Sequence, residues 1–283
     1  MRALTRKPVA YLEGVDQVVG DLTGPMEVLS EACAGVDAVF HLAGANEVEA
    51  GADPDGTLAS TVAGTRRIAE AAGAAGVPRL IYLSTVHVYG ASMTEGAVLT
   101  EQSPTAPRHP YALARLASEH VAASVPDLEV VVFRLTNGVG APVDASIRRW
   151  TLVANDLCRQ AAVSGTVELK SHGLQWRDFV ALRDVCRIVA ASAEQAALAP
   201  GTYNLGAGSP MTIRSLAALV QDAYEARTGD RPPLTAPEPP DRSPTPYTVS
   251  VARLRDQGWT MESTVADAVD ETAAFCLEHR NAL

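Results

Sequence analysis

The chain has 283 residues, 20% of them charged, and a net charge of −10. Its length suits one large α/β domain, or one domain with a smaller lobe. The basic residues are scattered, which argues against nucleic acid or an anionic membrane as a partner but allows a small phosphate-bearing ligand. No apolar run reaches the roughly 18 residues of a membrane span. The four cysteines form no Cys-x-x-Cys pair, so we expect reduced thiols and a cytoplasmic location.

Short apolar runs alternate with alanine-rich stretches of helical character in the first half of the chain. The sequence predicts strands at residues 17–21, 38–43, 80–83 and 129–135, and helices at residues 25–34, 58–75 and 110–123. This order is typical of an α/β fold with a parallel, doubly wound sheet.

The alternation stops after about residue 137. The sequence then predicts a strand at 167–170, a strand at 203–206, and helices at 150–162, 213–227 and 265–279, with another helix from Arg183 and a proline-rich loop at 232–246. We expect one domain of residues 1–136 and 176–208, and a smaller lobe of residues 137–175 and 209–283. No set of His, Cys, Asp and Glu has metal-ligand spacing, so no metal site is predicted.

Two short stretches carry the strongest chemical signal. Thr85 ends the apolar run at 80–83, and Tyr111 lies just inside a helix that Pro110 can start. Arg115 follows four residues later on the same helical face. A nearby cation lowers the pKa of a phenol from its usual value of about 10. These groups suit proton transfer at a carbinol oxygen while a hydride moves on carbon, although each residue also has an ordinary structural interpretation.

These residues resemble the active site of the extended short-chain dehydrogenase/reductases, the nucleotide-sugar epimerase/dehydratase group, in which a Ser or Thr accompanies Tyr-x-x-x-Lys. The resemblance runs from the first residues to about Trp259. It implies a Rossmann-like dinucleotide-binding domain, a smaller C-terminal α/β substrate lobe, a nicotinamide cofactor and a homodimer. Further motifs in the family's order are Gly20-Asp21-Leu22, Phe40-His41-Leu42-Ala43-Gly44, Gly64-Thr65, Val88-Tyr89-Gly90, Arg134-Leu135-Thr136-Asn137-Gly138, Arg177-Asp178-Phe179 and Tyr203-Asn204-Leu205-Gly206.

Three departures from the family pattern qualify this resemblance. The start lacks Gly-x-x-Gly-x-x-Gly, the loop that holds a pyrophosphate, and residues 1–6 resemble the family's second strand. We therefore expect the family's first strand to be missing, with exposed strand edges on both sides of the gap that it leaves. We also expect a truncated chain or a misplaced start rather than a native beginning. Without the glycine loop, binding of NAD(P)H should be weak. Arg115 replaces the lysine, which keeps the charge but removes a lysine proton relay. Thr61 stands where the family has Asn.

The resemblance also implies a set of cofactor-binding residues. Arg6 is expected to reach the adenosine ribose, where an arginine suits the 2′-phosphate and so favours NADP over NAD. Asp21 and Leu22, at the end of the strand at 17–21, match positions beside the adenine. The small residues Ala43 and Gly44, at the end of the strand at 38–43, match positions that allow the cofactor to approach closely. The full predicted set is Arg6, Asp21, Leu22, Ala43, Gly44, Tyr111 and Arg115.

Four residues are predicted to bind substrate. Arg177 matches a position often set against a diphosphate, where a planar guanidinium suits the anion, and Arg242 is a possible second clamp. Asn137 is expected to bond the sugar or the nucleotide. Val86 and His87 replace the Asp-Glu pair of the family's sugar 4,6-dehydratases, which argues against elimination of water; His87 could instead assist protonation.

Three functions remain open from the sequence. The leading one is an NAD(P)-dependent reductase or epimerase of a nucleotide-activated sugar, with Tyr111 exchanging the proton. The second is a non-catalytic Rossmann-like protein that binds a ligand or partner, favoured by the missing glycine loop, Arg115 and Thr61. The third is a reductase of a polyketide or other small ketone. It is favoured if the side chains of Arg177 and Arg242 do not converge on one cleft, because a diphosphate would then lack its two clamps.

Overall fold

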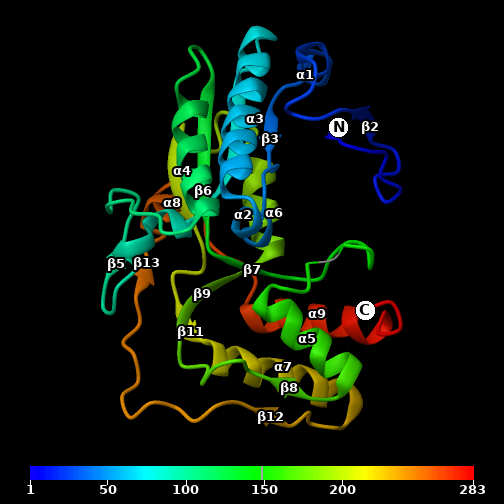
Figure 1. Cartoon of the computed structure of the whole chain (residues 1–283), viewed down its shortest axis with the longest axis vertical. Coiled ribbons are helices and arrows are strands. Elements are labelled where there is room, and N and C mark those ends of the chain that lie inside the picture. The colour runs from blue at the N-terminus through cyan, green and yellow to red at the C-terminus, as the bar shows by residue number, and fades with distance from the viewer. Residues whose placement is uncertain (148) are drawn as a thin grey trace. The chain divides into compact units, whose positions relative to one another are not determined.

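The computed structural model describes residues 1–147 and 149–283. These residues form two compact units, which differ from the two parts expected from the sequence (Figure 1). The first unit consists of Met1–Met93, Glu101–Leu135 and Val189–Asn204, and the second of Thr94–Thr100, Thr136–Ile188 and Leu205–Leu283.

The first unit is built on a four-stranded sheet in the order β10-β6-β4-β3. These strands are β3 (Val39–His41), β4 (Arg79–Thr85), β6 (Glu129–Leu135) and β10 (Gly201–Leu205). Strands β3, β4 and β6 run parallel, with Leu80 opposite both Val39 and Val130. Strand β4 is buried along almost its whole length, which explains its continuous apolar sequence. The predicted α/β fold with a parallel sheet is confirmed.

Two further strands form a separate parallel pair, β1 (Arg2–Thr5) and β2 (Asp16–Val19). Among the residues that the structure describes, β1 pairs only with β2 and β3 only with β4, so β1 and β3 are both edge strands. Phe40 and Leu42, at the edge strand β3, are 42% and 55% exposed. The exposed strand edges expected from the sequence are therefore present.

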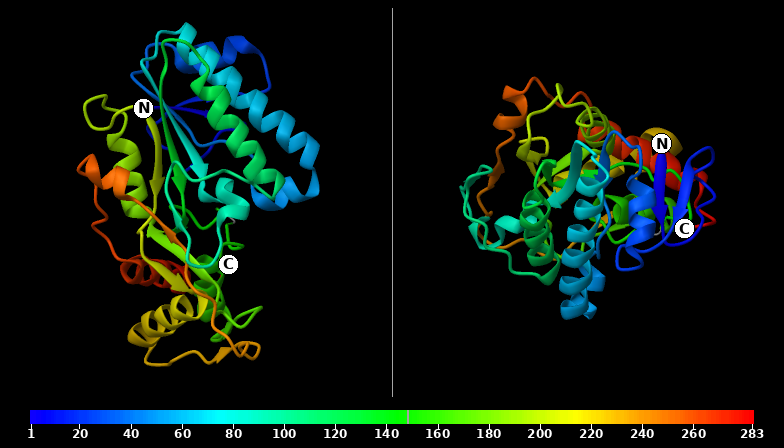
Figure 2. Two further views of the ribbon diagram at one scale, coloured as in Figure 1. Left: turned by 90° about the vertical axis from the view of Figure 1, so that its left-hand side faces the viewer. Right: turned by 90° about the horizontal axis from the view of Figure 1, so that it is seen from above.

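Except for α1, the helices of the first unit introduced here begin at a side-chain cap. They are α1 (Met26–Cys33), α2 (Glu47–Ala52), α3 (Pro54–Ala74), α4 (Pro110–Ala123) and the 3₁₀ segment η1 (Val86–Ser92). Helix α4 has the predicted bounds, with Pro110 in its first turn and His109 as its N-cap. Helix α3 starts earlier than predicted because the Asp53 side chain caps it. Figure 2 shows α3 and α4 packed side by side.

Helix α2 was not predicted from the sequence. Its N-cap is Asn46, whose Oδ1 accepts from the backbone N–H of Glu49 at 3.0 Å. The Glu49 carboxylate accepts in turn from the Asn46 backbone N–H at 3.0 Å, which completes a capping box. The helix is too short to show an apolar period, so only this capping signal marks it in the sequence.

The second unit has a three-stranded sheet covered by three helices. The elements are β7 (Asn137–Val139), β9 (Trp176–Ala181), β11 (Pro210–Thr212), α5 (Val153–Ser164), α7 (Ile213–Thr228) and α9 (Val265–Glu278). Strand β9 is central: it is parallel to β7 and antiparallel to β11. For this reason residues 176–188 belong to the second unit, whereas the division expected from the sequence had placed them in the first.

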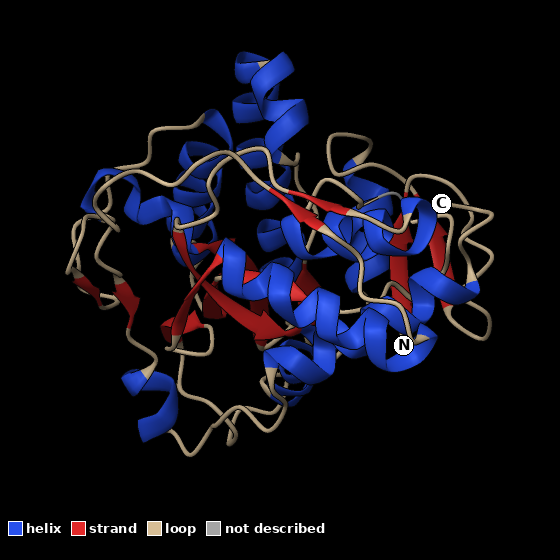
Figure 3. Cartoon of the chain, turned by 90° about the horizontal axis from the view of Figure 1, so that it is seen from below, coloured by secondary structure: helices blue, strands red, loops and turns tan. Residues whose placement is uncertain are grey.

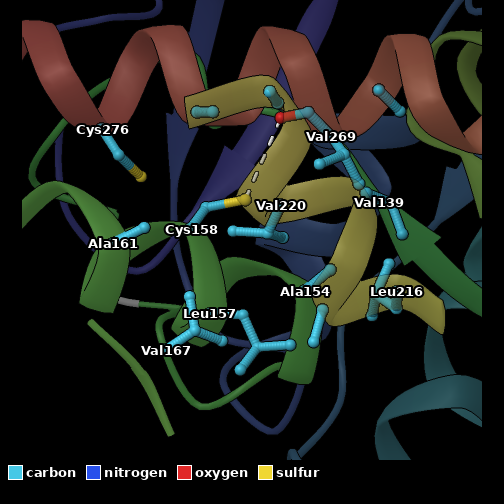
Figure 4. Packing of buried hydrophobic residues seen from close by; sticks show 14 of the residues in the cluster. Val139, Ala154, Leu157, Cys158, Ala161, Val167, Leu216, Val220, Val269 and Cys276 are labelled. Carbon is cyan, nitrogen blue, oxygen red and sulfur yellow. Dashed lines mark hydrogen bonds between the residues drawn. The ribbon is translucent and has the colours of Figure 1, made fainter. Parts of the chain in front are cut away.

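The core of the second unit lies between these helices and the sheet (Figure 4). Cys158 is fully buried there beside Leu157 and Val220, and its Sγ lies 3.9 Å from the carbonyl oxygen of Val269. Burial raises the pKa of the Cys158 thiol. The thiol is therefore a packing group rather than a reactive one.

Short pairings complete the second unit. Strand β5 (Val98–Leu99) pairs with β13 (Thr248–Val249), and β8 (Val167–Glu168) pairs with β12 (Leu234–Thr235). Helix α6 (Leu182–Ala191) follows β9 directly, and α8 (Ala252–Asp256) follows β13. Apart from β12, the proline-rich segment at 232–246 is a loop, as predicted (Figure 1; loops are tan in Figure 3).

The described part of the chain contains no helix with both the length and the apolarity needed to cross a membrane. It also contains no group of three or more His, Cys, Asp and Glu side chains arranged to hold a metal ion. All four cysteines are free, and three of them are buried.

His41 is a buried packing residue of the first unit. Its side chain is only 4% exposed, and its ring stacks on Tyr82 with the centroids 5.3 Å apart. Its Nε2 lies 2.9 Å from the hydroxyl of Thr65. Burial, with a smaller contribution from the charge of Arg115, lowers the pKa of His41 to about 3. The imidazole is therefore neutral in the folded protein near neutral pH.

We predict that His41 makes the folded state sensitive to acid. An unfolded histidine titrates near pH 6.5, so the stability linked to neutral His41 is complete above about pH 6.5 and is lost as the pH falls toward 3. His41→Gln should flatten the difference in unfolding free energy between pH 7 and pH 4.5, measured by chemical denaturation. His120→Gln, which changes an exposed histidine of α4, is the control. Equal pH dependence in wild type and His41→Gln would contradict this role.

Candidate functional site

Thr85 lies at the carboxyl end of β4 and is 5% exposed. Its Oγ1 accepts from the backbone N–H of His87 at 3.2 Å and so starts the 3₁₀ segment η1. The same side chain hydrogen-bonds the phenol of Tyr111. The structural role that the sequence left open for Thr85 is therefore present, and its contact with Tyr111 leaves the functional role a prediction.

Tyr111 is placed by the start of α4. Its backbone N–H donates to Nδ1 of His109 at 3.2 Å, which fixes the first turn of the helix. Helix α4 packs against β4 and η1, so the phenol lies at the end of β4, beside Thr85. The predicted meeting of a strand-end hydroxyl with a helical tyrosine is present within the first unit.

Arg115, one turn later, is buried between the ends of two strands. Its Nη1 donates to the carbonyl oxygens of Ala43 at 3.2 Å and Leu83 at 3.3 Å. Its guanidinium carbon lies 5.4 Å from the ring centroid of Tyr111 and 5.9 Å from that of Tyr82. The arginine therefore joins the residues after β3 to β4 while holding its charge against two aromatic rings.

The pKa of Tyr111 is raised above its ordinary value overall, although the charge of Arg115 lowers it, as expected from the sequence. Burial of the phenol is the largest cause and outweighs the charge of Arg115. The charge of Glu47 and the neighbouring Tyr82 raise the pKa further, whereas the hydrogen bond with Thr85 lowers it. Tyr111 is accordingly protonated at neutral pH.

Glu47 is not among the site residues predicted from the sequence, but its charge contributes to the raised pKa of Tyr111. It stands in the first turn of α2, a helix that packs against α4. A Cβ placed on Gly51 of α2 would lie 3.8 Å from His109, the cap of α4. The capping signal from Asn46 to Glu49 could have identified α2, and with it a carboxylate near Tyr111.

Arg6 and Asp21 follow the ends of the paired strands β1 and β2, and both are exposed. The Asp21 carboxylate accepts from the backbone N–H of Thr23 at 2.8 Å and from its hydroxyl at 2.6 Å. These hydrogen bonds, followed by the weaker effect of the Arg6 charge, lower the pKa of Asp21. Leu22 packs on the core, and its carbonyl accepts from Nε of Arg67 at 2.8 Å.

Ala43 and Gly44 are exposed at the end of β3. Gly44 has a φ of 148°, and a Cβ there would lie 2.9 Å from the guanidinium carbon of Arg115. Residue 44 must therefore be glycine for Arg115 to occupy its position.

The remaining predicted residues have protein partners within their own units. His87 is half-buried in η1 of the first unit. In the second unit, Asn137 donates from Nδ2 to the carbonyl oxygen of Asp178 at 2.8 Å. Arg177 hydrogen-bonds Tyr247, and its Nη1 donates to the carbonyl of Trp176 at 2.8 Å. Arg242 is exposed and pairs with Glu95 at 2.7 Å. The predicted substrate roles of these four residues stay predictions.

A buried ionic network supports the end of β4. Arg134 of β6 pairs with Glu119 of α4 at 2.7 Å, and both side chains are less than 10% exposed. The Glu119 carboxylate accepts from the hydroxyl of Ser84 at 2.5 Å. The guanidinium of Arg134 also lies 5.0 Å from the ring centroid of Tyr89. This network ties α4 to the two central strands next to Thr85.

Comparison with known proteins gives a consistent result. Residues 2–206 match the NAD dependent epimerase/dehydratase family. The chain is 28% identical to dTDP-glucose 4,6-dehydratase of Streptomyces niveus, over 98% of this chain and 80% of the relative. It is 27% identical to UDP-glucose 4-epimerase 3 of Oryza sativa subsp. japonica, over 89% and 72%.

The fold also matches solved structures. A short-chain dehydrogenase/reductase superfamily protein from Agrobacterium tumefaciens with bound NAD superposes with a TM-score of 0.75 at 28% identity, covering 99% of this chain and 90% of that one.

We predict that Gly44→Ala destabilises the protein because its methyl group would displace the Arg115 guanidinium. Overpacking of this kind costs about 1–3 kcal/mol in the free energy of unfolding. Gly76→Ala is the control, since Gly76 also has a positive φ, 70°, but a Cβ there meets nothing within 4 Å. In a double-mutant cycle, Gly44→Ala should cost less when Arg115 is already alanine. Equal costs in both backgrounds would show that the two residues are not in contact.

Proposed function

The chain belongs to the NAD dependent epimerase/dehydratase family and is an enzyme of this group, and we propose that it reduces or epimerises a nucleotide-activated sugar. Tyr111 is the general acid and base in this proposal. The observation that supports it most strongly is that Thr85, Tyr111 and Arg115 come together in the first unit although the sequence separates them by up to 30 positions.

In the reduction, Tyr111 donates its proton to the carbonyl oxygen of the sugar; a bound nicotinamide would supply the hydride for the carbon. Tyr111 is protonated at neutral pH, and the charge of Arg115 offsets part of the effect by which burial makes it a weaker acid. Thr85 hydrogen-bonds the same oxygen and orients it. Arg115 stabilises the phenolate that is left, because its fixed positive charge lies beside the ring. In the reverse direction Tyr111 accepts the proton of the sugar hydroxyl.

Several residues of the first unit fit a nicotinamide cofactor. Nε of Arg115 is a buried donor without a partner in the described part of the chain, which suits a ribose hydroxyl as acceptor. Ala43 and Gly44 are exposed beside it and leave room for close approach. Asp21 and Leu22 flank the expected adenine position, and Arg6 favours NADP through a 2′-phosphate.

Among the reactions of this family, elimination of water is less favoured for this chain than reduction or epimerisation. Val86 and His87 stand where the 4,6-dehydratases have an acidic pair, and neither supplies a carboxylate. We propose that Asn137, Arg177 and Arg242 of the second unit bind the nucleotide or its diphosphate. For His87 of the first unit we propose a role in assisting protonation. A homodimer and a cytoplasmic location complete the proposal; the latter is supported by the four free cysteines.

A second candidate substrate is a small ketone without a diphosphate. It is favoured by the protein partners that already engage the two proposed clamps: Tyr247 and Trp176 for Arg177, and Glu95 for Arg242. Binding of UDP or dTDP alone, measured by calorimetry, separates the two candidates, since only the nucleotide-sugar enzyme needs a site for the diphosphate.

We predict that Tyr111→Phe abolishes turnover without unfolding the protein. The change removes one hydroxyl and conserves volume, and loss of general acid–base help costs about 10²-fold or more in kcat. Reduction is measured as the loss of NADPH or NADH absorbance with 4-keto UDP- and dTDP-hexoses. Epimerisation, which consumes no net cofactor, is measured by chromatography of the UDP- and dTDP-hexoses. The control is Tyr11→Phe, which changes an exposed tyrosine. Full turnover by Tyr111→Phe would assign the proton transfer to another group.

We predict a preference for NADPH over NADH that depends on Arg6. Arg6→Ala should weaken NADPH binding about tenfold while leaving NADH binding unchanged, because only NADPH carries the 2′-phosphate. Lys7→Ala removes the adjacent exposed charge and is the matched control. Fluorescence titration with both cofactors measures this, and equal affinities in wild type would contradict the assignment of Arg6.

A further inference from the structure

The second unit contains an open cavity of about 500 Å³ at the ends of two strands. Val139, the last residue of β7, and Ala181, the last residue of β9, both line it, and they are partners in the parallel pairing of these strands. Crevices beyond the carboxyl ends of parallel strands are the usual ligand sites of open α/β sheets. The volume also lies in the range of small-molecule sites. None of the residues predicted to bind cofactor or substrate lines this cavity.

Three helices complete the cavity. Helix α6 follows β9 directly, and α9 packs against α5, β7 and β9 (Figure 1). Ala181 and Ala268 of α9 are small and buried in the lining, so the elements that they belong to leave space between them. Gly140 lets the segment after β7 approach the start of α6, since a Cβ there would lie 2.9 Å from Cβ of Leu182. The cavity is therefore formed by regular elements of the second unit.

The walls of the cavity are mainly apolar, and part of this apolar surface is open to solvent. Val143 is 74% exposed and Leu152 is 36% exposed. Pro142, Ile147 and Leu182 add to the same surface. An apolar ligand would remove this surface from water, which favours binding.

Three charged side chains of the lining already have protein partners. Arg183 of α6 pairs with Glu271 of α9 at 2.5 Å. The carboxylate of Asp267 accepts from the hydroxyl of Thr264 at 2.7 Å and belongs to the capping box of α9. Since these charges are engaged, the lining suits a neutral ligand better than a charged one.

Asn155 of α5 gives the lining a specific polar group. The residue is only 6% exposed. Its Nδ2 donates to the carbonyl oxygen of Arg149 at 3.3 Å, whereas its Oδ1 is buried without a partner in the described part of the chain. Buried acceptors are seldom left unpaired in a folded protein. A hydrogen-bond donor is therefore missing at this side chain.

We propose that this cavity binds a neutral, apolar ring compound with one hydroxyl group, which donates to Oδ1 of Asn155. The rings replace water on the apolar walls, and the hydroxyl supplies the missing donor. The site is additional to the proposed sugar chemistry and does not depend on it, because the lining contains none of the residues assigned to that reaction.

The first test compares 2-naphthol with 2-methoxynaphthalene, which has the same rings but no donor, by calorimetric titration of the full chain. Wild type should bind 2-naphthol about tenfold more tightly, because the ether leaves the acceptor unpaired. Asn155→Leu should reduce this ratio to near one. Gln160→Met removes an amide from the same helix, outside the cavity, and should leave the ratio unchanged. No binding of 2-naphthol, or an unchanged ratio in Asn155→Leu, overturns the proposal.

The second test locates the bound compound in the wild-type protein. Cys186 lines the cavity and is exposed, whereas the other three cysteines are buried. Iodoacetamide should therefore alkylate Cys186 selectively, and saturating 2-naphthol should protect it, as measured by mass spectrometry. Undiminished alkylation of Cys186 in the presence of saturating 2-naphthol would place the compound elsewhere and so overturn the proposal, even where Asn155→Leu does not fold.

Discussion

The site depends on one buried interaction, the arginine of α4 inserted between the ends of two neighbouring strands. The Nη1 group of Arg115 bonds the carbonyl oxygens of Ala43 and Leu83. It therefore joins the edge strand β3 to the central strand β4 at the end of the sheet where Thr85 lies. A buried cation is costly unless it is hydrogen-bonded. Here the strand-end carbonyls accept from Nη1 and two tyrosine rings lie against the guanidinium, whereas Nε has no partner in the described part of the chain.

This position of Arg115 affects its neighbours in three ways. Gly44 must lack a side chain because the guanidinium occupies the space a Cβ would need. His41 is kept neutral by burial and, in part, by the same charge. The charge of Arg115 stabilises the phenolate of Tyr111, but burial has the larger effect on the pKa and keeps the phenol protonated. The residues around Arg115, and not Tyr111 alone, therefore accommodate an arginine at the position where the family has lysine.

The parts of the fold that are long and regular could be predicted from the sequence. Helix α4 and strand β6 have the predicted bounds, because Pro110 starts one and a continuous apolar run forms the other. The meeting of Thr85 and Tyr111 follows from the parallel sheet, since a strand end and the next helix start are neighbours in such a fold.

What could not be predicted depends on three-dimensional burial. The direction of the pKa shift of Tyr111 is set by desolvation, which spacing along a helix does not reveal. Glu47 was missed because α2 is too short for an apolar period. The segment 176–188 was assigned to the wrong neighbours because β9 pairs on both sides with strands that are distant in sequence.

The central claim is that Tyr111 is a protonated acid whose phenolate is stabilised by Arg115. It is tested most directly by the pKa of Tyr111, measured by carbon-13 NMR of ring-labelled tyrosine, in wild type and in Arg115→Met, which removes the charge and conserves most of the volume. The account predicts a pKa above the ordinary value of about 10 in wild type and a higher value in Arg115→Met. A wild-type pKa well below 10, or no change on removing the arginine charge, would contradict it.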